Sequence, residues 1–318
     1  MASRDIASLV DGVLRGEQRA LARAISLVEN RGPEAPGLLA ALFPHCGGAL
    51  IIGVTGPPGA GKSTLVDRLT ARLRRQGKNV GIVAVDPTSP YSGGAILGDR
   101  IRMQAHALDE GVFIRSMATR GQLGGLAAAT GHALIVLSAA GKDVLLVETV
   151  GVGQDEVDIV NTADVSLVVL VPGLGDEVQA LKAGIMEIAD VFVVNKADRD
   201  GVDRLVAEIQ AMLSLTTQPG RQPEIVKTVA SEDRGIDELL RAVEAFRSQA
   251  GSSGLFARNR RAHLRRLFEE TLRERLMQRV REGALTAEQV ERILDRLESR
   301  ATDPFTAAGE VLESLGLK

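Results

Sequence analysis

Apolar residues at helical spacing open the chain, and a glycine–proline pair ends this pattern. The recurring positions are Ile6, Leu9, Val10, Val13, Leu21, Ile25 and Val28. Their spacing of three or four residues predicts amphipathic helices. Gly16 separates two groups of these positions, and Gly32 with Pro33 stops the second group. We therefore expect residues 1–47 to form an N-terminal helical segment.

From residue 49 onward, short apolar runs alternate with stretches that have helical patterns. The runs are Leu50–Thr55, Val80–Val85, Val112–Ile114, Val144–Val147, Leu167–Val171, Val191–Val194 and Ile225–Val229. Most are apolar at successive positions, which is typical of strands buried on both faces of a parallel sheet. This alternation predicts an α/β fold with a mostly parallel, doubly wound sheet over residues 48–250. Its last helix is expected at residues 236–249.

The C-terminal part of the chain has a different pattern. The small-residue stretch AGSSG at residues 250–254 predicts a linker. Apolar residues then step by four along one face of an arginine-rich helix, at Leu264, Phe268, Leu272, Leu276 and Val280. Thr286 with Gln289 predicts a capping box for the next helix, and Asp303-Pro304 begins the last one. We expect residues 251–318 to form a helical arm, whose apolar stripe packs on its own domain or on a second subunit.

Composition and charge exclude several classes of protein. The chain has 318 residues, and its 38 Lys and Arg against 41 Asp and Glu give a net charge of -3. This balance argues against a partner that is a nucleic acid or a membrane surface. The single cysteine, Cys46, excludes a disulfide framework within one chain. No apolar run approaches the ~20 residues that span a bilayer, and we expect a cytoplasmic protein.

The strongest chemical signal is a phosphate-binding loop. It comprises Gly56, Pro57, Pro58, Gly59, Ala60, Gly61, Lys62 and Ser63, followed by Thr64, and it matches the G-x-x-x-x-G-K-[ST] pattern. An apolar run precedes the loop and a helical stretch follows it, as the motif requires. The glycines let the backbone aim its N–H groups at phosphate oxygens. Lys62 supplies positive charge for the terminal phosphates, and the Ser63 hydroxyl is a ligand for Mg²⁺.

A second motif, Asn195-Lys196-Ala197-Asp198, follows the apolar run DVFVV. N-K-x-D is the guanine-reading motif of GTPases. A carboxylate at Asp198 accepts two hydrogen bonds from the N1–H and 2-amino groups of guanine, and adenine lacks this pair of donors. A buried Asp198 would therefore favour GTP over ATP. A calcium loop that starts at Asp198 is excluded, because the further ligands are missing at the required spacing.

Acidic residues at strand ends are candidates for the metal side of the site. Glu148 follows a buried apolar run, at the usual place of the Mg²⁺-side acid. Asp86 follows another run, and Asp99 lies in the segment GDRIR; either one could hold a Mg²⁺-bound water or orient the attacking water. A helix N-cap or an ordinary loop acid is the alternative role for each of these residues. Gly151 can donate its backbone N–H to a γ-phosphate and so respond to hydrolysis.

Together, these segments resemble one family of GTPases. VTGPPGAGKST, AVDPTSPYSGGAILGDRIRM, VETVGVGQDE, VPGLGDEVQALKAGIMEIAD and VVNKAD are similar to the methylmalonyl-CoA mutase-associated GTPases (MeaB), a group also named ArgK, a transport kinase. The resemblance implies a P-loop GTPase of the SIMIBI class that forms a homodimer through a C-terminal arm. It also implies a chaperone that uses GTP to gate adenosylcobalamin loading, and to protect or repair, a cobalamin-dependent acyl-CoA mutase.

The resemblance also implies roles for individual residues. The phosphate and Mg²⁺ positions fall on Lys62, Ser63, Asp86, Asp99 and Glu148, of which Lys62, Asp99 and Glu148 are the catalytic candidates. The guanine positions fall on Asn195, Lys196 and Asp198, and the loop that backs the base on Ala230 and Ser231. Switch candidates are Gly151 and Gln154 in one segment and Asp176 and Lys182 in another. The expected cofactors are GTP or GDP and Mg²⁺.

Other functions stay open as alternatives. A P-loop kinase that uses ATP on a transport protein or a small molecule predicts an acceptor pocket, but the Asn195–Asp198 motif argues for guanine. A nickel-delivery GTPase needs a His or Cys cluster, and one cysteine with 4 scattered histidines argues against it. A structural protein with an inactive site would not need an intact Lys62. No arginine finger is assigned, with Arg100 and Arg102 as candidates, so we expect slow intrinsic hydrolysis that a partner accelerates.

Overall fold

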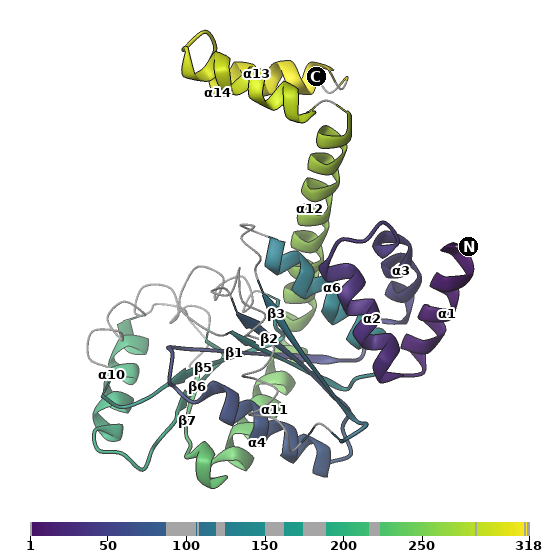
Figure 1. Ribbon diagram of the computed structural model, residues 1–318. Helices are drawn as coiled ribbons and strands as arrows, with labels where there is room; N and C mark the ends of the chain where they lie inside the picture. The colour runs from purple at the N-terminus through teal and green to yellow at the C-terminus, as the bar shows by residue number, and fades with distance from the viewer. Residues whose placement is uncertain are drawn as a thin grey trace. The chain divides into compact units, whose positions relative to one another are not determined.

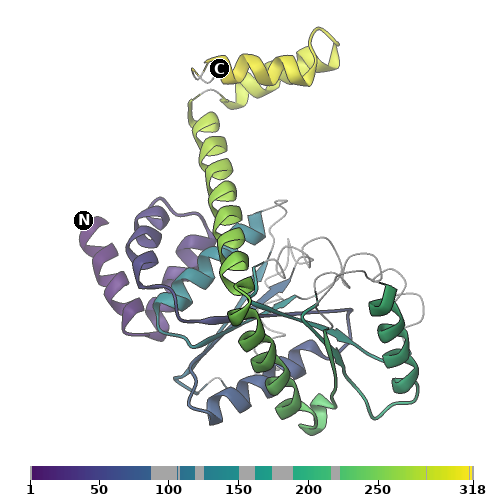
Figure 2. The ribbon, with the colours of Figure 1, turned by 180° about the vertical axis from the view of Figure 1, so that it is seen from behind.

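The computed structural model describes residues 2–86, 106, 108–118, 125–149, 162–173, 189–215, 223–283, 285–314 and 316. It divides the chain into two compact units, Met1–His263 and Leu264–Lys318. The first unit is a sheet with helices on both of its faces, as Figures 1 and 2 show from opposite sides.

A parallel sheet forms the centre of the first unit. Its strands are β1 (Leu50–Thr55), β2 (Val80–Asp86), β3 (Val112–Ala118), β4 (Val144–Thr149), β5 (Val165–Leu170), β6 (Val191–Val194) and β7 (Glu224–Lys227). They lie in the order β3-β2-β4-β1-β5-β6-β7, and each neighbouring pair is parallel. The winding therefore extends to both sides of β1. The carboxyl ends of all these strands meet at one edge of the sheet, where ligands bind in folds of this kind.

Helices cover both faces of this sheet. They are α1 (Ala2–Leu14), α2 (Gln18–Glu29), α3 (Ala35–Leu42), α4 (Lys62–Arg75), α6 (Gly125–Ala139), α10 (Val202–Leu215) and α11 (Ile236–Ser252), with the 3-10 turns η1 (Phe43–His45) and η3 (Ala230–Glu232). Side chains of α4 and α11 form one core with the sheet. On the other face, α1, α2, α3 and α6 form a second core and α10 a third. The predicted doubly wound α/β fold is confirmed.

Strand β4 shows why its sequence is apolar at successive positions. Val144 and Leu146 belong to the core on the α4 face, whereas Leu145 and Val147 belong to the core on the α6 face. All four side chains are buried. A strand with both faces covered has no position left for an exposed polar residue, so alternation disappears from its sequence.

The prediction of a linker at residues 250–254 is wrong for residues 250–252, which belong to a helix. Helix α11 continues to Ser252, and α12 (Leu255–Gly283) begins only two residues after Ser253. Ala250 is buried in the core on the α4 face, so packing holds a stretch in the helix that its small residues alone would not. The chain turns at Gly254, which has a φ of 69°.

Three helical segments carry the remainder of the chain: α12, α13 (Ala287–Glu298) and α14 (Pro304–Ser314). The predicted capping box is confirmed, because Thr286 N donates to Gln289 Oε1 at 2.8 Å and Gln289 N donates to Thr286 Oγ1 at 3.3 Å. Asp303 caps α14 by accepting hydrogen bonds from the backbone of Phe305 and Thr306. Within the described part of the chain, none of the helices is both long and apolar enough to cross a membrane.

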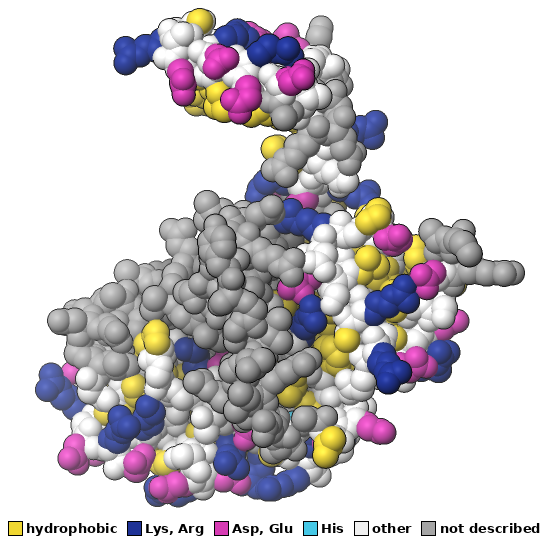
Figure 3. Space-filling view, in the orientation of Figure 1, with side chains coloured by type: hydrophobic (Ala, Val, Ile, Leu, Met, Phe, Trp, Pro, Cys, Tyr) yellow, Lys and Arg dark blue, Asp and Glu magenta, His cyan; other side chains and the backbone are white. Residues whose placement is uncertain are grey.

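The surface charges agree with the near-balanced composition. On the face drawn in Figure 3, Lys and Arg side chains are mixed with Asp and Glu side chains over the described residues. Apolar side chains gather along one side of the C-terminal helices in the same view. Exposed apolar residues of the second unit, Leu264–Lys318, include Phe268, Leu272, Leu294 and Phe305.

Candidate functional site

The phosphate-binding loop joins the carboxyl end of β1 to the start of α4. Gly56 has a φ of 138°, and a Cβ atom there would lie 2.1 Å from the carbonyl oxygen of Val169 on β5. Gly61, the N-cap of α4, has a φ of 88°, and its Cβ would lie 2.5 Å from Asn195 Nδ2. Both positions therefore require glycine for conformation and for space. The loop is held tightly against β5 and against the Asn195 segment.

The Lys62 side chain folds back over this loop. Its ammonium donates to the carbonyl oxygens of Gly56 at 2.6 Å and of Pro57 at 3.0 Å, and only 6% of the residue is exposed. The loop therefore concentrates positive charge at the N-terminus of α4, where backbone N–H groups and the helix dipole also favour an anion. Thr64 is exposed on the first turn of the helix.

Ser63 and Glu148 come together across the sheet edge. The Ser63 hydroxyl donates to Glu148 Oε1 at 2.6 Å, and Glu148 is 1% exposed. Glu148 lies near the end of β4, whose register places it beside Val54 of β1 and Ala84 of β2. A hydroxyl and a buried carboxylate that converge at a phosphate loop form an all-oxygen donor set, which is the kind that Mg²⁺ prefers. The two residues fit this metal.

The other acids expected at the metal site are only partly described. Asp86 is the last residue of β2, one position beyond the paired residues Val85 and Thr149, so its backbone lies at the same edge of the sheet as Glu148. Its side chain lies outside the described residues, as does all of Asp99. The switch candidates Gly151, Gln154, Asp176 and Lys182 also lie outside the described residues.

Asn195 connects three segments that lie far apart in the chain. Its Nδ2 atom donates to the carbonyl oxygen of Ala60 in the phosphate loop at 2.8 Å. Its Oδ1 atom accepts from Thr228 Oγ1 at 3.0 Å and from the backbone N–H of Ala230 at 3.1 Å. Asn195 is 2% exposed, so these bonds are shielded from water. The loop expected to bind phosphate and the loop expected to back the base are therefore joined by a single side chain.

The neighbouring residues of the guanine motif are more open. Lys196 has a φ of 55° and donates from Nζ to the carbonyl oxygen of Gly59 at 2.7 Å. Asp198 is exposed, whereas the sequence argument expected a buried carboxylate. Exposure at the end of the loop leaves its oxygens accessible to a ligand. Ser231 is likewise exposed on η3, next to the buried Ala230.

Thr228 is a further candidate site residue, which its sequence neighbourhood did not indicate. Besides its bond to Asn195, it accepts the backbone N–H of Ala197 at its carbonyl oxygen, at 3.0 Å. It follows the last strand directly and is 1% exposed. The available signal was a hydroxyl residue two positions before the Ala230-Ser231 pair.

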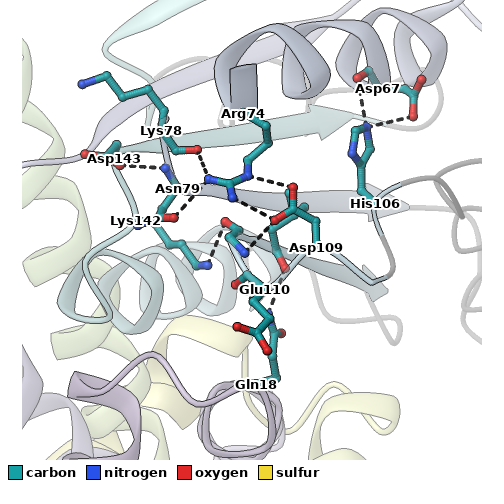
Figure 4. Close-up of polar contacts among 12 residues, drawn as sticks. Gln18, Asp67, Arg74, Lys78, Asn79, His106, Asp109, Glu110, Lys142 and Asp143 are labelled. Carbon is teal, nitrogen blue, oxygen red and sulfur yellow. Dashed lines mark hydrogen bonds and ion pairs between the residues drawn. The ribbon is translucent and has the colours of Figure 1, made fainter. Parts of the chain in front are cut away.

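A separate polar cluster lies at the opposite edge of the sheet, where strands β2, β3 and β4 begin. Figure 4 shows the Arg74 guanidinium between Asp109 and the Lys78–Asn79 turn. Arg74 Nε donates to Asp109 Oδ2 at 2.9 Å and its terminal amino group donates to Asp109 Oδ1 at 2.9 Å, and the hydrogen bond from Arg74 lowers the pKa of Asp109. Lys142, which is 6% exposed, donates to the carbonyl oxygen of Gly111, and burial lowers the pKa of its ammonium. This cluster anchors the start of β3 and lies away from the phosphate loop.

A separate contact near this cluster holds His106 against α4. His106 Nε2 lies 3.2 Å from both the carbonyl oxygen and Oδ1 of Asp67 (Figure 4). Asp67 and Arg74 are seven positions apart and so face the same side of the helix. The helix that begins at the phosphate loop therefore also fixes the stretch that leads into β3.

Comparison with known proteins identifies the family. The family model described as "Methylmalonyl Co-A mutase-associated GTPase MeaB" matches residues 21–284. A Pyrococcus abyssi protein that is named as a GTPase is 48% identical over 314 residues, which cover 98% of this chain and 97% of that protein. The mouse protein named "Methylmalonic aciduria type A homolog, mitochondrial" is 32% identical over 330 residues, covering 98% of this chain and 80% of that protein.

A solved structure shares the fold over nearly the whole chain. The crystal structure of a protein named "LAO/AO transport system kinase" superposes with a TM-score of 0.72 at 28% identity, and the alignment covers 99% of this chain and 98% of that one. That protein carries the name of a kinase, whereas the family model and the Pyrococcus protein carry the name GTPase. The chain belongs to the methylmalonyl-CoA mutase-associated GTPases, the MeaB family, and is a P-loop enzyme that hydrolyses GTP.

Proposed function

We propose that the residues that join the phosphate loop to the Asn195 motif form the nucleotide site, and that the bound species is GTP or GDP with Mg²⁺. The observation that carries the proposal is the Asn195 side chain, which links Ala60 of one loop to Ala230 of the other. A ligand that spans both loops would have its phosphates at Lys62 and its base beside Asp198. The exposed Asp198 carboxylate would accept the N1–H and 2-amino groups of guanine.

In this proposal Ser63 and Glu148 hold Mg²⁺, directly or through water, with Asp86 and Asp99 as further candidates. The metal supplies charge neutralisation at the transferring phosphoryl group. Lys62 would release its carbonyl partners and donate to the terminal phosphates, while the backbone N–H groups of residues 59–63 surround the phosphates. Glu148 and Ser63 fix the oxygens that orient the metal. The candidates for an arginine finger, Arg100 and Arg102, lie outside the described residues, and we expect slow hydrolysis by the chain alone.

We further propose that the nucleotide state controls a cobalamin-dependent acyl-CoA mutase, as a chaperone of adenosylcobalamin loading and of mutase protection or repair. The names of the family and of the mouse relative support this role. The test is capture of purified methylmalonyl-CoA mutase by the tagged chain with GDP, with a non-hydrolysable GTP analogue and without nucleotide. Retention that depends on the nucleotide, and that Lys62→Ala removes, supports the role; equal retention in all samples contradicts it.

The name of the structural relative, a transport-system kinase, favours a second candidate, a kinase that uses ATP. The two candidates differ in the base they select. Titration of the chain with fluorescent GDP and ADP separates them, since the guanine site predicts tight binding of GDP only. Tight ADP binding with weak GDP binding would favour the kinase and would contradict our assignment of Asp198.

We also propose that the chain forms a homodimer through its C-terminal helices. Leu264, Phe268, Leu272 and Leu276 step along α12 and are each 44–65% exposed in the single chain. Four large apolar side chains on one helix face are costly in water and are typical of an interface. Analytical ultracentrifugation of Phe268→Glu and Leu272→Glu should give monomers. Phe43→Glu is the matched control, because Phe43 is 49% exposed outside the arm.

A further inference from the structure

Helix α4 carries an arginine that contacts the loop behind the proposed base site. The Arg72 terminal amino group lies 3.0 Å from Asp233 Oδ2, and Arg72 Nε lies 3.3 Å from Asp237 Oδ1. The side chains of Arg72 and Asp233 are 23% and 33% exposed, whereas that of Asp237 is 62% exposed. Asp233 is therefore the better shielded partner, and the Arg72–Asp233 pair is the stronger of the two contacts.

Asp233 closes the loop that begins at Ala230. It follows η3 directly and has a φ of 60°, in the left-handed region that only a few residue types other than glycine adopt readily. Backbone hydrogen bonds of 3.0 and 3.3 Å join Val229 to Arg234 and shut the loop at its base. Two polar contacts hold this loop from outside, Ala230 N–H to Asn195 at one end and Asp233 to Arg72 at the other, and the Ala230 side chain packs in the core on the α4 face.

These contacts form a closed circuit. The circuit runs from Lys62 along α4 to Arg72, across to Asp233, through η3 to Ala230, through Asn195 to Ala60, and back to Lys62. A helix is stiff along its axis, so Arg72 is held at a fixed distance from the phosphate loop. The position of residues 230–233, here called the base-backing loop, relative to the phosphate loop is then set from both of its ends.

We propose that Arg72 is a positioning residue for guanine nucleotides, which acts through Asp233 and the base-backing loop and does not touch the nucleotide itself. The inference rests on the proposed base site. Removal of the Arg72 side chain should loosen the base-backing loop at Asp233, so that this loop is ordered only when the ligand binds. The nucleotide must then supply the ordering free energy, and its affinity falls.

The test compares Arg72→Gln with Arg75→Gln, a matched change at an exposed arginine of the same helix. Dissociation constants are measured for GDP, for a GTP analogue and for inorganic tripolyphosphate, which carries phosphates but no base. We expect Arg72→Gln to weaken both guanine nucleotides about threefold, the range of a partly exposed ion pair, and to leave tripolyphosphate affinity and kcat unchanged. Arg75→Gln should change none of these, and Arg72→Lys should restore part of the loss.

A double-mutant cycle identifies the partner. Asp233→Asn keeps a residue that tolerates the left-handed conformation, and it should weaken GDP as much as Arg72→Gln does, with no further loss in the double variant. Equal weakening of tripolyphosphate, or unchanged GDP affinity with only a lower Tm, would overturn the inference and leave Arg72 a structural residue. Asp198→Asn tests the base site independently. If this variant keeps its selectivity for guanine, the proposed base site is wrong. If its selectivity is relaxed but Arg72→Gln leaves the affinity for GDP unchanged, only the positioning role of Arg72 is refuted.

Discussion

Replacement of Asn195 by alanine should destabilise the protein even without nucleotide. The change removes three buried hydrogen bonds: one to Ala60, one from Thr228 and one from Ala230. Each such bond contributes about 1 kcal/mol net, so the expected loss in the free energy of unfolding is about 3 kcal/mol. For a unit of this size, 1 kcal/mol shifts the Tm by about 2–4 °C, which gives a fall of about 6–12 °C.

The assay is urea unfolding and thermal unfolding of the nucleotide-free chain, followed by the same measurements with saturating GDP. Asn195→Ala should lower the Tm in both conditions, and it should also reduce the extra stabilisation that GDP confers, because the two loops are no longer joined. Asp198→Asn is the matched control. Its side chain is exposed, so the nucleotide-free Tm should stay the same while guanine selectivity relaxes.

The reasoning is refuted if Asn195→Ala leaves the nucleotide-free stability unchanged. In that case the three bonds would be replaced by water without cost, and Asn195 would act only when a base is bound. A fall in stability with unchanged GDP affinity would mean the opposite, that the connection between the loops is structural and does not serve the ligand.

Three further predictions concern the metal and the charged residues near the start of β3. Glu148→Gln should weaken Mg²⁺ binding, so that GTP turnover falls about 10- to 100-fold and a hydrolysis assay requires more Mg²⁺. Chelation of Mg²⁺ with EDTA should stop the wild-type reaction. An unchanged Mg²⁺ dependence in the variant would contradict the metal role of Glu148. Arg74 lowers the pKa of Asp109, so the pair stabilises the fold above pH ~4 and loses that effect as the pH falls further. In urea unfolding, Arg74→Gln should lower the free energy of unfolding by up to about 1 kcal/mol at pH 7 and by less at pH 3. An equal loss at both pH values would disprove this prediction. Burial lowers the pKa of Lys142, so this group makes the stability of the fold rise as the pH climbs toward the ordinary lysine pKa. Lys142→Met should remove this contribution to the change in Tm between pH 7 and pH 10. An unchanged dependence of Tm on pH in the variant would refute the prediction.

The phosphate loop and the strands were predictable because their signals are local. Gly56–Thr64 is a continuous motif between a strand and a helix, and β4 is apolar at successive positions because both of its faces are covered. Strand β3 was predicted too short, at Val112–Ile114, because Arg115 and Ser116 interrupt its apolar pattern. The Arg115 side chain donates from one terminal amino group to Glu29 and Ser26 of α2, and no local sequence pattern records these contacts.

The contacts between loops could not be predicted for the same reason. Thr228 and Asn195 are joined only by the tertiary fold, as are Arg72 and Asp233. Each is an ordinary polar residue in a chain with 25% charged residues, and its sequence neighbourhood does not distinguish it from a solvated one. Motifs therefore indicated which loops are expected to meet the ligand, whereas the residues that hold those loops in place emerged only from the three-dimensional arrangement.

Helix α4 brings these separate systems into one rigid element. Its first residue, Lys62, belongs to the phosphate loop; Arg72 reaches the base-backing loop; and Arg74 anchors the loop before β3 at the other edge of the sheet. Because Arg72 and Arg74 point to different neighbours from nearby positions, their variants separate two effects that a general loss of helix stability would combine. A change at Arg72 should appear in nucleotide affinity, and a change at Arg74 in the acid dependence of unfolding. The helix can therefore be required for folding and, through a different side chain, for recognition of the base.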